Sequence, residues 1–317
     1  MLVTDPRARH VMRYAFGATL AMWMAMAGAW PISYLVPVLC LTFLASPKPP
    51  PSLREGLLFL ATLGAALIVA LWSIKYLLGS QFVFFTGIGL ILFRLFYAQC
   101  SGAPPILILW LLLSLLVLPM VAVQSPDIAA LVAQSLFVGA AASLLVAWTA
   151  HAIIPETREA GAAPPAPELP PARIRVQQAL ERMIVVYPLF ILFHLFEWLG
   201  AVLVLVFVGL LSIQPGFAEN FKGGIAMILG NTMGGLAAIV GFNLLTVVPR
   251  FEFLLGICLF AGLAFGNRLF GGGKAAPLFG MAFSTFLLIL GSTTSGEGEA
   301  ASAVYSRILQ ITMAVVY

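Results

Sequence analysis

Long apolar runs, interrupted by short polar or turn-forming stretches, are the main pattern along this chain. Windows of span length predict helices near residues 8–29, 32–46, 56–77, 80–99, 104–124 and 127–152. A second set is predicted near residues 178–196, 198–214, 222–245, 250–267, 275–293 and 300–317. No run alternates with the two-residue period of a membrane β-strand. The pattern therefore predicts an all-α membrane protein of about twelve transmembrane helices.

The second set of helices repeats landmarks of the first at a nearly constant spacing. At an offset of 168 residues the matches are Trp30 with Trp198, Pro47 with Pro215, Arg54 with Lys222, and Gly56 with Gly224. Further along, Arg94-Leu95-Phe96 recurs as Arg268-Leu269-Phe270 at an offset of 174. Ordered matches of this kind predict a duplicated six-helix unit.

The duplication divides the chain into a first membrane repeat at 1–153 and a second at 174–317. Residues 154–173 between them are rich in Pro and Ala, which predicts a semi-rigid linker. Within each repeat, the break between the first two spans is either a tight hairpin or a broken helix, at Trp30-Pro31 and Glu197-Trp198. The last span is short and ends in apolar residues, so we expect the chain to be truncated at its C-terminus.

Basic residues set the expected orientation, because short cytoplasmic loops carry the excess of Lys and Arg. With the N-terminus in the cytoplasm, thirteen of the 16 Lys and Arg residues fall on the cytoplasmic side of the predicted spans. An even number of spans in each repeat makes the two repeats parallel, with an axis along the membrane normal. We expect any central pathway to lie where such repeats meet, and the linker to be cytoplasmic.

Composition narrows the class of protein further. The chain is 62% hydrophobic and only 9% charged, so lipid is the expected solvent for most of it. Its net charge of +4 comes from residues spread over helix ends, which argues against nucleic acid as a partner. Nucleotide-binding and metalloenzyme motifs are absent from the sequence, and the cysteines Cys40, Cys100 and Cys258 stand singly. We therefore expect neither an enzyme nor a cofactor or metal.

The opening segment RHVMRYAFGATLAMWMAMAGAWPISYLVPVLCLTFLASP and the glycine-rich FKGGIAMILGNTMGGLAAIVG carry a family resemblance. Together with the six-plus-six layout, they resemble the fusaric acid resistance and aromatic acid exporter superfamily over nearly the whole chain. The resemblance implies an inner-membrane exporter of small aromatic acids that works beside a periplasmic membrane fusion protein. Plant malate-permeable anion channels are more distantly similar. The larger exporters have a sizeable cytoplasmic domain between the halves, which this chain lacks, so regulation by that domain is not carried over.

An exporter of organic anions needs cationic groups along its path, because Arg can replace part of the solvation that a carboxylate loses. Arg94 and Arg268, in the fourth span of each repeat, are the first candidates for substrate binding. Arg54 and Lys222, which begin the third spans, are a second pair. The alternative for both pairs is that the side chains extend to the interface and determine topology.

Polar residues within the spans supply the remaining candidates. Asn231 and Thr232 lie in a glycine-rich span and are candidate substrate ligands, whereas close helix packing is the alternative explanation of the glycines. His194 and Glu197 stand three residues apart and are candidates for proton coupling. Their alternative role is a polar ending of the span that meets water beside Trp198.

The sequence thus predicts a multi-pass efflux transporter of the bacterial inner membrane. The expected substrates are small aromatic or other organic acids, or amphipathic toxic compounds, and the expected energy source is an ion gradient. A passive organic-anion channel and a non-transport envelope assembly protein are the alternatives. The bilayer, a small organic anion and a membrane fusion protein are the expected partners, and homo-oligomerisation is left open.

Overall fold

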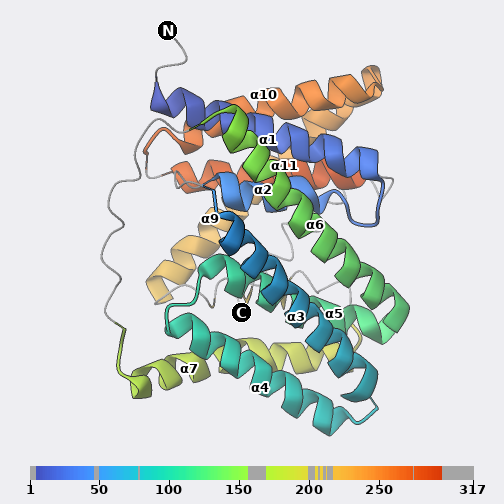
Figure 1. Cartoon of the computed structure of the whole chain (residues 1–317), viewed down its shortest axis with the longest axis vertical. Helices are drawn as coiled ribbons and strands as arrows, with labels where there is room; N and C mark the ends of the chain where they lie inside the picture. Colours follow the sequence, from blue (N-terminus) through green and yellow to red (C-terminus); the bar gives the residue numbers. More distant parts are fainter. Residues whose placement is uncertain are drawn as a thin grey trace. The chain divides into compact units, whose positions relative to one another are not determined.

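The computed structural model describes residues 5–45, 50–77, 79–155, 169–198, 204–205, 208–209, 212, 217–273 and 275–294. Regular structure in these residues is helical throughout, which confirms the all-α prediction. The helices are α1 (Pro6–Gly28), α2 (Leu35–Leu44), α3 (Leu53–Leu77), α4 (Gln81–Cys100), α5 (Pro105–Gln124), α6 (Pro126–Ile153), α7 (Ala172–Leu195), α9 (Phe217–Val247), α10 (Phe251–Leu269) and α11 (Ala276–Thr294), labelled in Figure 1.

Seven helices are long and apolar enough to cross a membrane: α3, α4, α6, α7, α9 from Gly224, α10 and α11. The chain is therefore a multi-pass membrane protein. The helix α2 has 10 residues, about 15 Å or half the thickness of a bilayer core, so a full span near 32–46 is not confirmed. The predicted span near 300–317, most of the predicted span near 198–214 and most of the predicted linker lie outside the described residues. The total of twelve spans stays a prediction.

The chain forms two compact units. Unit 1 contains α1, α2, α10 and α11. It also contains the part of α6 after Phe137 and the part of α9 after Gly224. Unit 2 contains α4, α5 and α7, with α3 from Leu57 and the first part of α6. Each unit therefore combines helices from both predicted repeats.

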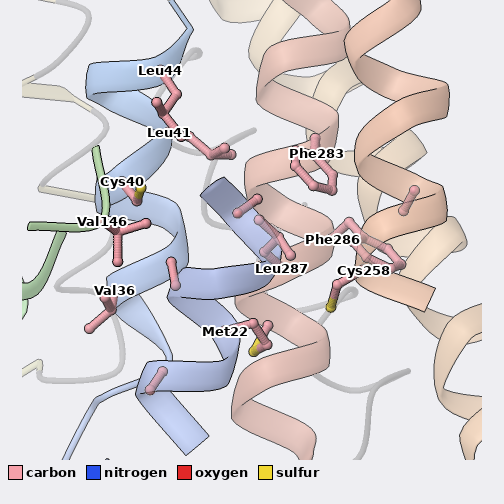
Figure 2. Packing of buried hydrophobic residues seen from close by; sticks show 14 of the residues in the cluster. Met22, Val36, Cys40, Leu41, Leu44, Val146, Cys258, Phe283, Phe286 and Leu287 are labelled. Carbon is pink, nitrogen blue, oxygen red and sulfur yellow. The ribbon is translucent and has the colours of Figure 1, made fainter. Parts of the chain in front are cut away.

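Unit 1 is built around the packing of α1 against α10 and α2, with α11 beside α10 and α2. Small residues allow the close approach: a Cβ on Gly262 of α10 would lie only 2.8 Å from Ala15 Cα on α1. Such contacts maximise dispersion where lipid removes the hydrophobic force between helices. Figure 2 shows the apolar core of this unit, where side chains from α1, α2, α10 and α11 meet. Labelled members include Met22, Cys40, Cys258 and Phe286.

Unit 2 is organised by α4 and α7, which pack along one another and both contact α5. At Gly89 of α4 an added Cβ would lie 3.0 Å from the ring of Tyr187 on α7. The Tyr187 hydroxyl donates to the carbonyl oxygen of Phe85 at 2.7 Å, which also joins these helices. Thus the first predicted span of each repeat packs on the fourth span of the other repeat: α1 on α10, and α7 on α4.

The first helix of each predicted repeat ends in the same unusual backbone. Ala29 follows α1 with φ 48°, and Glu197 follows α7 with φ 52°, both in the left-handed region that non-glycine residues rarely adopt. These two residues are 168 positions apart, and each precedes a tryptophan. Beyond Ala29 the chain turns through residues 31–34 into α2, which packs back on α1. The break at Trp30-Pro31 is therefore a tight turn between packed helices.

Candidate functional site

The predicted arginine pair lies on the fourth spans. Arg94 is exposed and stands six residues before the end of α4, in unit 2. Arg268 is exposed as well and is the second-last residue of α10, in unit 1. Both side chains are therefore open to a solute or a lipid headgroup, and their joint role in one path stays a prediction.

The second predicted pair begins the third spans. Arg54 is exposed in the first turn of α3, where Ser52 and Glu55 form a capping box. The Ser52 backbone N–H donates to Glu55 Oε2 at 2.7 Å, and the Glu55 N–H donates to Ser52 Oγ at 3.3 Å. This cap holds the start of α3 and so the position of Arg54. Lys222 belongs to α9, but its side chain lies outside the described residues.

The polar candidates on α9 take part in helix packing. Asn231 is buried, its Nδ2 donates to the Met227 carbonyl at 2.8 Å, and its Oδ1 accepts from the hydroxyl of Thr285 on α11 at 2.7 Å. Thr232 is half-buried, and its hydroxyl donates to the Ile228 carbonyl of its own helix. Asn231 therefore links α9 to α11, whereas Thr232 makes a local bond.

The glycines around Asn231 explain how α9 and α11 come so close. A Cβ on Gly230 would lie 2.8 Å from Met281 Cβ, and one on Gly234 would lie 2.9 Å from Thr285 Cβ. Two glycines four residues apart open one face of a helix to a neighbouring backbone. The close-packing explanation of this motif is confirmed for α9 and α11, and a substrate role for Asn231 and Thr232 stays a prediction.

His194 is enclosed by aromatic rings at the C-terminal end of α7. Its ring stacks on Phe84 with centroids 5.0 Å apart, meets Phe85 edge-on at 5.4 Å, and stacks on Phe190 at 5.9 Å. The side chain is 8% exposed, and its Nδ1 is buried with no hydrogen-bond partner among the described residues. An imidazolium in this position would stack on the faces of Phe84 and Phe190, and the face of an aromatic ring attracts a cation.

Glu197 follows as an exposed residue in the turn after α7. Its backbone N–H donates to the His194 carbonyl at 3.4 Å, so the two predicted proton-coupling residues share one helix end. The carboxylate faces outward while the imidazole is buried. Such a pair has the parts of a proton relay, an exposed acceptor beside an enclosed one, and that role stays a prediction.

Sequence reasoning did not single out Arg13, which is 1% exposed on α1. Its Nη2 lies 2.7 Å from His10 Nδ1, and since guanidinium only donates, His10 accepts at Nδ1. The His10 ring also stacks on Phe270, with centroids 5.6 Å apart. The available signal was an Arg flanked by apolar residues one turn inside a predicted span, a setting in which ionisable residues are costly.

Two further arginines attach the first spans to the fourth spans. On α1, Arg7 Nη2 donates to the carbonyl and the side-chain oxygen of Asn267, near the end of α10, at 2.7 and 2.9 Å. On α7, Arg175 Nη1 donates to the hydroxyl of Ser101, the C-cap of α4, at 2.8 Å. Arg7 and Arg175 are 168 positions apart, the offset of the predicted repeat.

Comparison with protein-family models finds no match to this chain. Searches of curated proteins and of solved structures find no significant match either.

Proposed function

We propose that this protein is an efflux transporter of the bacterial inner membrane, which exports small aromatic or other organic acids, or amphipathic toxic compounds. The observation that carries the proposal is the enclosed His194 on α7, a helix long and apolar enough to cross a membrane, together with the buried Arg13 on α1. Ionisable groups at such positions are expensive and usually serve the passage of ions or solutes.

The duplicated, parallel architecture that we propose has three independent supports. The helix pairing is reciprocal, since α1 packs on α10 as α7 packs on α4. The two helix ends at Ala29 and Glu197 share a left-handed backbone. Equivalent arginines, Arg7 and Arg175, bind the C-terminal ends of the fourth spans. Parallel repeats of this kind are a common architecture of secondary transporters.

Anion selectivity is proposed from the sign of the charges. The basic residues on the described helices include Arg94 and Arg268, both exposed on the fourth spans and both able to offer a fork of N–H donors to a carboxylate. A weakly attractive cationic path lets an anion enter and leave again. A membrane fusion protein as partner rests on the family resemblance alone.

Proton coupling is proposed for His194 with Glu197. The enclosed imidazole has a buried nitrogen with no partner among the described residues, and Glu197 lies one turn away at the exposed helix end. Proton transfer between them would change the charge next to Phe84 and Phe190, where α4 and α7 pack.

The test is efflux of a labelled panel of aromatic acids from cells that express the chain, with and without a fusion-protein partner and before and after a protonophore. Saturable, protonophore-sensitive export supports the proposal. An ohmic anion current that persists after the proton gradient collapses would replace it with a passive channel. Verified expression without flux of any acid would favour the envelope assembly role.

A further inference from the structure

Arg175 and Arg182 lie on one face of α7. They are seven residues apart, which is about two helical turns, or 10 Å along the axis. Ala179 and Val186 continue this face and are buried, in a helix that packs on α4. Two cationic side chains therefore lie on the face of α7 that packs against α4, in unit 2. Both side chains are half-buried.

Arg175 is held in place by α4. Its Nη1 donates to Ser101 Oγ at 2.8 Å, and its guanidinium carbon lies 5.4 Å from the ring centroid of Tyr97. A hydrogen bond and a cation–π contact together fix the plane of the guanidinium. Tyr97 in turn stacks on Phe93 with ring centroids 6.4 Å apart, so the ring that contacts Arg175 is itself supported by a neighbour on α4.

Both arginines keep donors that the described protein does not use. The Nε of Arg175 and the Nη1 of Arg182 are buried, and neither has a hydrogen-bond partner among the described residues. The neighbouring carboxylate, Glu181, is exposed and accepts from Gln177 Nε2 at 3.0 Å. A buried charged donor without an acceptor is unfavourable, so an acceptor that completes these donors is favoured.

The equivalent place in unit 1 is different. Arg7 corresponds to Arg175, but it is exposed and its Nη2 is saturated by two oxygens of Asn267. Tyr14 stands at the position equivalent to Arg182, and its ring packs on Phe283 in the core. Among the described residues, the arginine pair at these two equivalent positions is therefore found on α7 and not on α1.

We propose that Arg175 and Arg182 form an oxyanion-binding site on the α4–α7 contact, with the Tyr97 ring along one side. The ligand is a carboxylate or phosphate oxyanion, because two guanidinium forks match the planar or tetrahedral oxygens of those groups. The oxyanion is carried either by a free organic acid or by an anionic lipid headgroup, and basic pockets between membrane helices bind headgroups in this way. The site does not depend on the export activity proposed above.

The experiment uses the whole chain, purified and placed in lipid nanodiscs. One arm measures binding of labelled benzoate in discs of phosphatidylcholine alone. The other arm measures, by native mass spectrometry, retention of phosphatidylglycerol from mixed discs. Arg182→Gln is expected to weaken binding of the relevant probe at least tenfold. Arg173→Gln is the matched control, because Arg173 is exposed on the same helix and its loss changes the charge equally.

Benzoate binding that depends on Arg182 assigns the site to free acids, and Arg182-dependent retention of phosphatidylglycerol assigns it to lipid. Binding of neither probe by the wild-type chain overturns the proposal, as does an equal loss in Arg173→Gln and Arg182→Gln. Arg182→Lys keeps the charge without the fork and is used if Arg182→Gln does not fold. Its binding should lie below wild type, and wild-type binding by the Lys variant would also overturn the proposed geometry.

Discussion

The bond between Asn231 and Thr285 allows the packing and binding roles of α9 to be separated. Thr285→Val keeps the shape of the side chain but removes the hydroxyl that donates to Asn231 Oδ1 at 2.7 Å. Interhelical hydrogen bonds in membrane proteins contribute about 0.6 kcal/mol on average and up to about 1.7 kcal/mol. Because both side chains are buried at a close helix crossing, we expect a loss of about 1 kcal/mol in the free energy of unfolding.

The measurement is reversible unfolding in mixed micelles as the fraction of denaturing detergent rises. Thr232→Val is the matched control: its hydroxyl bonds only its own helix, so we expect a loss below about 0.5 kcal/mol. A double-mutant cycle of Thr285→Val with Asn231→Leu should return a coupling near 1 kcal/mol. Unchanged stability in Thr285→Val would refute the packing argument. If the same variant kept its stability but lost efflux, that result would place Asn231 in substrate binding.

Three other predictions concern separate parts of the molecule. Replacing Arg94 or Arg268 with Gln should reduce efflux several-fold without affecting membrane insertion. Lys at either position should give less efflux than Arg, and full efflux in the double Gln variant would reject the pair as a substrate site. His194→Gln should leave the fold intact but reduce the protonophore-sensitive part of efflux, measured against an imposed pH gradient, and an unchanged gradient dependence would exclude it from coupling. Gly262→Leu should cost roughly 1–3 kcal/mol in the unfolding assay, since even a Cβ would press on Ala15, and wild-type stability would show that the helices can separate there.

Helix positions could be predicted from the sequence wherever an apolar run ends abruptly. The expected spans near 80–99, 250–267 and 275–293 differ by only one or two residues from α4, α10 and α11. The start of α7 was missed by six residues, because Ala172–Gln177 is a charged first stretch without apolar periodicity. Hydropathy marks the part of a helix that lipid can cover, whereas the helix itself extends beyond it.

The side chains that matter for a site could be predicted only in part. Asn231 was recognised as an unusual polar residue, but its partner Thr285 is 54 residues away and no local pattern links them. Arg13 and Arg175 entered only the count of basic residues, whereas the structure buries Arg13 and bonds Arg175 to Ser101 of α4. A sequence shows that a charge lies in a span, and only packing shows which face of the helix carries it.

The pairing of α1 with α10 has a consequence for how the chain is made. Arg7 and its partner Asn267 are 260 residues apart, so at synthesis rates of 5–20 residues per second α1 waits roughly 10 to 50 s for its partner. During that interval α1 lacks the helix against which it packs in the folded chain. The packing of the first helix is therefore completed only after nearly the whole chain has been made. A chain that stops before α10 lacks both the contact of Arg7 with Asn267 and the helix face on which α1 packs.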